Sequence, residues 1–157
     1  MTALVADGSG GHPDVLAAQV ICGAAVSGAR VLMLLPQARD DDEVWRRMIT
    51  LLADGDPRSA ARALGHLPIS LHTSGTGWDR VRGAELIYTP GVQIRELRRL
   101  RDQTNAPILV TNKGIDRQSV NCSIEILRVS DDAVLLDSEG VKVSVVYDPS
   151  GPIYRPA

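Results

Sequence analysis

The chain has 157 residues, of which 44% are hydrophobic and 23% charged, and its formal net charge is -2. A chain of this length can bury a core without metals or disulfides, so we expect one globular domain. The slightly acidic balance argues against nucleic-acid binding, which is typical of strongly basic domains. No apolar run is long enough to predict a membrane helix, and no basic segment followed by an apolar one predicts a secretory signal. We therefore expect a cytoplasmic protein with no membrane partner.

The chain has two cysteines, Cys22 and Cys122, and neither belongs to a CxxC pair. His12, His66 and His72 do not show the close spacing of zinc ligands either. The sequence therefore predicts no metal site, and no motif predicts a cofactor.

The first 35 residues read as strand, turn, helix and strand. Residues 2–6 form a short apolar run, and residues 14–27 are apolar on nearly all sides, which is typical of a buried helix. Gly28 follows as a helix stop, and residues 30–35 are a continuous apolar run typical of a strand covered on both faces.

The same alternation continues as far as residue 114. Helices are expected at residues 44–53, 58–64, 78–82 and 92–103, and strands at residues 67–72, 85–88 and 107–111. This rhythm predicts an α/β fold with three layers, Rossmann-like, in which helices cover both faces of a largely parallel sheet.

The rhythm changes in the last quarter of the chain. Strands are expected at residues 123–129, 133–137 and 141–147, and the short polar turns between them predict a C-terminal antiparallel meander. We therefore predict a single domain over residues 1–148, with β/α alternation in 1–114 and the meander in 115–148. Residues 149–157 are predicted to be an irregular tail.

A glycine-rich turn between the first strand and the first helix is the main candidate site. Glycines let backbone N–H groups approach an anion, and the start of a helix favours negative charge. The predicted ligand-binding residues of this turn are Gly8, Ser9, Gly10, Gly11 and His12. His12 and Asp7 are the candidate catalytic residues, because either could move a proton there.

A second candidate loop follows the third strand and contains His72, Ser74 and Gly75. In a parallel sheet this loop and the glycine-rich turn both leave from the carboxyl edge, where open α/β sheets bind ligands. We therefore expect His72 and His12 to converge on one site. The alternative for each segment is purely structural: a tight strand-to-helix connection, and a polar strand end.

The turn matches none of the complete motifs. Gly8-Ser9-Gly10 lacks the third glycine of G-x-G-x-x-G, no Lys-Ser/Thr pair follows as in a P-loop, and G-x-S-x-G is absent. Residues 8–12 resemble the loop of a family of glycosyltransferases in which it faces the sugar-nucleotide. Residues 9–11 resemble the loop of the NAD(P)HX epimerases, but the positions that correspond to the catalytic carboxylate are not acidic here, which implies an inactive relative.

The expected function is a non-catalytic module that binds a small anionic ligand or a protein partner at the carboxyl edge of its sheet. The first alternative is an enzyme acting on a nucleotide, a sugar-nucleotide or a phosphorylated metabolite. The second is a structural subunit of a larger assembly or a homo-oligomer, for which the meander offers an edge strand.

Overall fold

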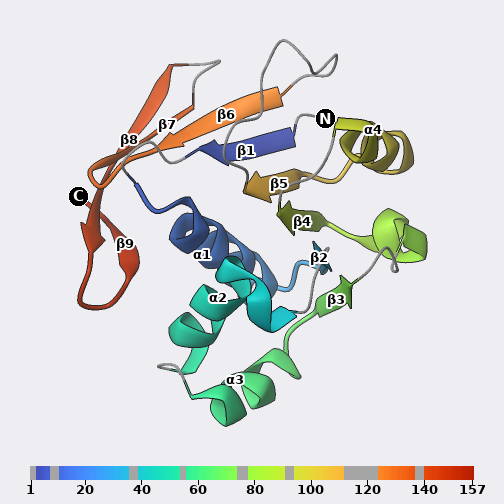
Figure 1. Ribbon diagram of the computed structural model, residues 1–157, viewed down its shortest axis with the longest axis horizontal. Helices are drawn as coiled ribbons and strands as arrows, with labels where there is room; N and C mark the ends of the chain where they lie inside the picture. Colours follow the sequence, from blue (N-terminus) through green and yellow to red (C-terminus); the bar gives the residue numbers. More distant parts are fainter. Residues whose placement is uncertain are drawn as a thin grey trace.

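The protein is a mixed α/β structure built on one long sheet (Figure 1). The computed structural model describes residues 3–7, 11–35, 39–53, 56–73, 78–90, 94–111, 124–136 and 140–157. The strands run in the order β3-β2-β4-β5-β1-β6-β7-β8-β9. Their bounds are β1 (Ala3–Asp7), β2 (Val31–Leu35), β3 (Ile69–Thr73), β4 (Leu86–Pro90), β5 (Ile108–Thr111), β6 (Ile124–Val129), β7 (Ala133–Leu136), β8 (Val141–Asp148) and β9 (Ile153–Pro156).

The six strands from β3 to β6 are all parallel to their neighbours. The prediction of a largely parallel sheet is therefore confirmed. The Rossmann-like arrangement is not confirmed, because β1 lies between β5 and β6 rather than beside β2. In dinucleotide-binding folds the order is 3-2-1-4-5-6, with the first strand at the centre.

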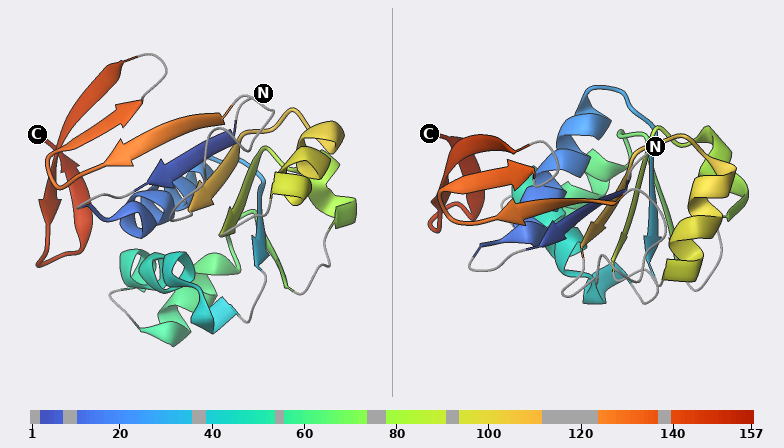
Figure 2. Two further views of the ribbon diagram at one scale, coloured as in Figure 1. Left: turned by 45° about the horizontal axis from the view of Figure 1, so that its top comes forward. Right: turned by 90° about the horizontal axis from the view of Figure 1, so that it is seen from above.

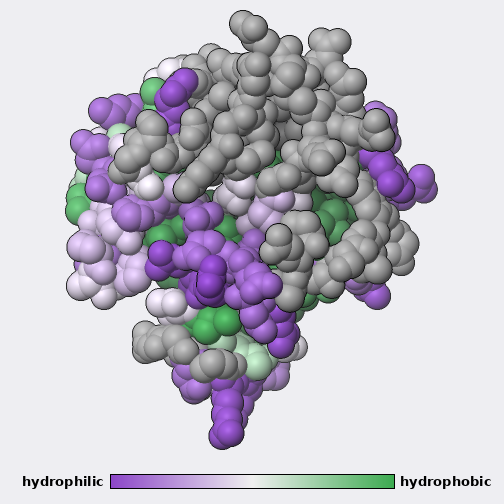
Figure 3. Space-filling model, viewed as in Figure 1, coloured by the Kyte–Doolittle hydropathy of each residue, from purple (hydrophilic) through white to green (hydrophobic). Residues whose placement is uncertain are grey.

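Helices cover both faces of the parallel sheet (Figure 2). The first face carries α1 (Pro13–Val26), α2 (Glu43–Ala53) and α3 (Pro57–Leu64). The second face carries the 3-10 helix η2 (Trp78–Gly83) and α4 (Ile94–Gln103), and a further short turn, η1 (Arg39–Asp41), precedes α2. On the side seen in Figure 3, hydrophilic residues form much of the coloured surface over α2, and a hydrophobic area shows between α2 and α3.

Local sequence explains where α1 starts and stops. Pro13 occupies the first helical position, where no N–H is needed, and Asp14 lies in the first turn, where the helix dipole favours a carboxylate. At the other end Gly28 has φ +94°, a left-handed conformation that glycine adopts at low cost. The predicted helix stop at Gly28 is confirmed.

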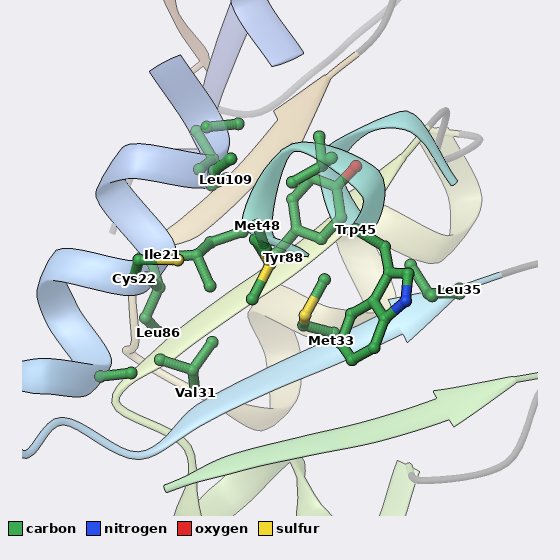
Figure 4. Close-up of a cluster of buried hydrophobic side chains, with 14 residues drawn as sticks. Ile21, Cys22, Val31, Met33, Leu35, Trp45, Met48, Leu86, Tyr88 and Leu109 are labelled. Atoms are coloured by element: carbon green, nitrogen blue, oxygen red, sulfur yellow. The ribbon is translucent and has the colours of Figure 1, made fainter. Parts of the chain in front are cut away.

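The core is divided between the two faces because successive strand residues point to opposite sides. In β2, Val31, Met33 and Leu35 face α1 and α2, whereas Leu32 packs on the second face with Val81 of η2. Figure 4 shows the first-face cluster, to which α1 contributes Ile21 and Cys22, and α2 contributes Trp45 and Met48. Burying each large side chain of this kind contributes about 1.5–3 kcal/mol.

The C-terminal meander is confirmed: β6, β7 and β8 pair antiparallel in chain order. The prediction of an irregular tail over residues 149–157 is wrong, because β9 pairs antiparallel with β8. Tyr154 of β9 is 6% exposed and packs with Val15 of α1 and Val129 of β6. The proline- and glycine-rich segment before β9 is typical of irregular structure, so the sequence did not indicate this strand. In the fold that segment forms a turn that returns the chain along β8.

In the part of the chain that the structure describes, the helices are all too short or too polar to cross a membrane.

Candidate functional site

The connections that follow β2 and β4 lead to opposite faces of the sheet. After β2 the chain passes to α2 on the first face, whereas after β4 it passes to α4 on the second face. The two strands are parallel neighbours. Where the connections after two neighbouring strands lead to opposite faces, open α/β sheets bind ligands at the carboxyl edge. The carboxyl ends of β2 and β4 are therefore the place to look for convergent polar groups.

A carboxylate and two hydroxyls meet there. The hydroxyl of Tyr88, in β4, lies 3.4 Å from Asp42 Oδ2 and 3.0 Å from Thr111 Oγ1, at the end of β5. Asp42 precedes α2, and its Oδ1 accepts a hydrogen bond of 2.9 Å from the backbone N–H of Trp45, as a helix-capping residue does. The ring of Tyr88 is fully buried, and Figure 4 shows its oxygen at the margin of the hydrophobic cluster. The core thus fixes the position of this hydroxyl.

The electrostatics of this group differ from those of ordinary surface residues. Burial raises the pKa of Asp42, against the opposing effect of the hydrogen bonds that it accepts. Burial also raises the pKa of Tyr88, and the negative charges of Asp42 and Asp14 add to the increase. Two carboxylates therefore act on one buried hydroxyl, and the phenol stays protonated at any physiological pH.

The indole N–H of Trp45 is a hydrogen-bond donor without an acceptor among the described residues. Trp45 lies close to Asp42 in the sequence, at the same edge of the sheet. Trp45 is 6% exposed, and no acceptor among the described residues bonds its buried Nε1. Figure 4 places this nitrogen beside Leu35, at the carboxyl end of β2. The guanidinium carbon of Arg39 lies 5.5 Å from the centre of the indole ring. An unpaired buried N–H costs about 1–3 kcal/mol, so this donor is a candidate contact for a bound molecule.

His12 belongs to a different group, formed with the C-terminal strands. Its backbone N–H donates to Tyr154 Oη at 2.9 Å, and its Nε2 lies 3.3 Å from Asp131 Oδ1. Its ring stacks on Tyr147 with 3.8 Å between centroids and 16° between planes. The described part of the glycine-rich turn thus holds the meander against α1.

Gly11 is explained by the same packing. A Cβ at this position would lie 2.8 Å from Ser130 Cα and would also clash with the backbone of Val129. The residue must therefore be glycine to let the β6–β7 turn approach, whether or not an anion binds. The predicted anion contacts of Gly8, Ser9 and Gly10 lie outside the described residues.

The predicted convergence of His12 and His72 is wrong. His72 lies in β3, an outer strand that β2, β4 and β5 separate from β1. At about 4.8 Å per strand the two strands are about 19 Å apart. His72 also aligns with Leu34, on the second face, whereas His12 precedes a helix of the first face. Ser74 and Gly75 lie outside the described residues.

Asp7, the other candidate catalytic residue, ends β1 beside Arg128 of β6. Its backbone is at the carboxyl edge, as predicted, and its side chain is not described. In the described part of the chain, no group of three His, Cys, Asp or Glu side chains is placed to hold a metal ion.

Sequence reasoning missed the hydrogen-bonded group of Asp42, Tyr88 and Thr111, and also the indole N–H of Trp45. Asp42 lies just before the helix that the sequence predicts at residues 44–53, and Trp45 lies inside it. The available signal was a tyrosine at the end of an apolar strand, whose hydroxyl needs a partner once the ring is buried. Tyr88 and Asp42 are 46 residues apart, so local patterns could not bring them together.

No model of a known protein family matches the chain, and a search of curated proteins finds no significant match.

Proposed function

We propose that the chain is a non-catalytic binding module that holds a small hydroxyl-bearing molecule, such as a sugar or a nucleoside, at the carboxyl edge of its parallel sheet. The observation that carries this proposal is the hydrogen-bonded group of Asp42, Tyr88 and Thr111 between strands whose connections diverge. Polar groups fixed by a buried core at that position are what a ligand site requires.

The chemistry of these groups supports a hydroxyl-bearing ligand. A carboxylate accepts hydrogen bonds, the indole N–H of Trp45 donates one, and the two hydroxyls can do either. A sugar hydroxyl is both donor and acceptor and can satisfy such a mixed set. The negative charges of Asp14 and Asp42 both act on the Tyr88 hydroxyl. They disfavour the binding of a negatively charged group beside it. An anionic ligand remains the prediction from the glycine-rich turn alone.

Matched ligand pairs test the proposal. We expect adenosine or glucose to raise the melting temperature more than AMP or glucose 6-phosphate, since each pair differs only by a phosphate. A ligand at a hundred times its Kd stabilises the fold by about 2.7 kcal/mol. A larger shift with the phosphorylated member would favour the anionic alternative. No shift across a broad panel of sugars, nucleosides and polyols would contradict the proposal.

Variants locate the site. Tyr88→Phe removes the hydroxyl and keeps the ring, and Asp42→Asn keeps a capping oxygen and removes the charge. We expect each to weaken binding of the neutral ligand about tenfold, or about 1.4 kcal/mol. Asp56→Asn is the matched control, because Asp56 caps α3 in the same way at an exposed position. Unchanged affinity in both Tyr88→Phe and Asp42→Asn would place the ligand elsewhere.

The second candidate function is an enzyme acting on a nucleotide, a sugar-nucleotide or a phosphorylated metabolite. The contact between His12 Nε2 and Asp131 supports it, since a carboxylate that orients an imidazole is common in acid–base catalysis. Any ligand found by the panel is then assayed for turnover. Turnover lost in His12→Gln, with binding and melting temperature retained, would favour the enzyme; absence of turnover in the unmodified chain would oppose it.

A further inference from the structure

A cavity of about 540 Å³ lies at the opposite, amino edge of the sheet. It is bounded by the starts of β2 and β3 and by the end of η2. Its wall is largely apolar and includes Val31, Leu32, Leu67, Pro68, Ile69 and Ala84. Small-molecule sites commonly have volumes of about 300–1,000 Å³ and predominantly apolar linings. The volume and lining therefore suit a small molecule with an apolar body.

Two arginines line this cavity, and they differ in their partners. Arg30 is held in place, since its Nε donates to the carbonyl of Gly83 at 2.7 Å and its Nη2 lies 2.9 Å from Glu85 Oε1. Its charge is therefore already balanced. Arg80 extends from η2 and is exposed, and no carboxylate among the described residues pairs with it. Within the described part of the chain, Arg80 is thus the arginine of this cavity whose charge no carboxylate balances.

The elements that carry these groups are well anchored. Val81, next to Arg80, is fully buried against the second face of the sheet with Leu32 and Ile87. Ser70 of β3 is in register with Leu32, so it lies on the same face, and its hydroxyl has no hydrogen-bond partner among the described residues. A hydroxyl and a guanidinium, neither of which has a partner among the residues that the structure describes, therefore border one apolar cavity.

We propose that this cavity binds a small apolar carboxylic acid. The carboxylate would pair with Arg80 and accept a hydrogen bond from Ser70, and the hydrocarbon part would cover the apolar wall. Arginine suits this role because its planar fork can donate two parallel hydrogen bonds to a carboxylate. The positive charges of both arginines repel a cationic ligand. A fully polar ligand would make no apolar contacts with the apolar wall. This site is independent of the one proposed at the carboxyl edge.

Ligands of equal chain length and different head groups test the proposal. Octanoate, octanol and octylamine are titrated below their micellar concentrations and followed by calorimetry. We expect octanoate to bind at least tenfold more tightly than octanol, and octylamine to bind weakest. Equal affinity for octanoate and octanol would mean apolar contact alone and would overturn the proposal, as would preference for the amine.

Variants separate this cavity from other apolar surfaces. Arg80→Gln is expected to weaken octanoate binding about tenfold and to leave octanol binding unchanged. Ser70→Leu, which fills the cavity, is expected to weaken both ligands. Arg62→Gln, at an exposed position of α3, is the control and should bind octanoate normally. If Arg80→Gln and Ser70→Leu, each shown by circular dichroism to be folded, bind octanoate like the unmodified chain, the assignment is wrong.

Discussion

At the scale of single residues, Gly11 and Gly23 differ in the space that is available for a side chain. A methyl group at Gly11 would meet the backbone of Val129 and Ser130, whereas nothing lies within 4 Å of a Cβ at Gly23, inside α1. We expect Gly11→Ala to lower the free energy of unfolding by about 1–3 kcal/mol. Gly23→Ala should raise it by about 0.5–1 kcal/mol, because alanine favours the helix. Urea unfolding of both variants measures the difference, and equal effects would contradict the close approach at Gly11.

Asp42 gives a pH-dependent prediction. Burial raises its pKa in the folded chain above the ordinary 3.8, so its ionisation disfavours folding. The stability that this group contributes is present below pH 3.8 and is lost as the pH rises through the raised pKa. Asp42→Asn cannot ionise and keeps the cap of α2. We therefore expect it to gain stability relative to the unmodified chain as the pH rises from about 3 to 7. A difference in unfolding free energy that is constant over this range would contradict the shift.

At the scale of elements, one side chain joins β9 to α1. Gln19 Nε2 donates to the carbonyl of Tyr154 at 2.9 Å, and Gln19 Oε1 accepts from the N–H of Tyr154 at 2.8 Å. This amide takes the place of a strand neighbour on the side of β9 where no strand of the described residues pairs with it. Gln19→Ala leaves both backbone groups without their partner, so we expect faster hydrogen exchange at Tyr154 and earlier proteolysis near the C-terminus. Val20→Ala, at the next and more exposed position, should leave both unchanged. Unchanged exchange in Gln19→Ala would show that side-chain packing alone holds β9.

The elements themselves were largely predictable, and their order in the sheet was not. The apolar run at residues 30–35 became β2, and the helix expected at residues 44–53 became α2, whose buried side holds Val44, Trp45 and Met48. These patterns are local. The position of β1 between β5 and β6 is not, because a short apolar strand fits equally well beside any strand that is covered on both faces.

The same distinction applies to the two candidate sites. The glycine-rich turn was visible as a motif, yet His12 and Gly11 contact residues more than a hundred positions away. Those contacts explain Gly11 and His12 by packing and could not be read from the spacing of the motif. Likewise, the sequence placed His72 correctly at the end of a strand but could not tell that three strands separate it from β1.

At the scale of the whole molecule, the rate at which the Cys22 thiol reacts measures how often the folded core opens. It lies in the core between α1 and the sheet, and burial raises its pKa to about 11. The reactive thiolate is therefore scarce at neutral pH, and reagents reach the sulfur only when the core opens. In a Cys122→Ser variant, we expect alkylation of Cys22 to be slow in buffer and to accelerate with urea in parallel with unfolding. Rapid alkylation without urea would mean that α1 separates from the sheet locally.

The place of β1 has a consequence for synthesis of the chain. Its backbone pairs with β5 and β6, so Ala3 finds its partners at Ile108 and Ile124. β1 is therefore synthesised before either of its neighbours and stays unpaired until β5 and β6 have been made. Pairings at such sequence separation are slow to form and leave apolar strands open to aggregation in the meantime. The order of strands in this sheet thus leaves β1 in need of protection during translation.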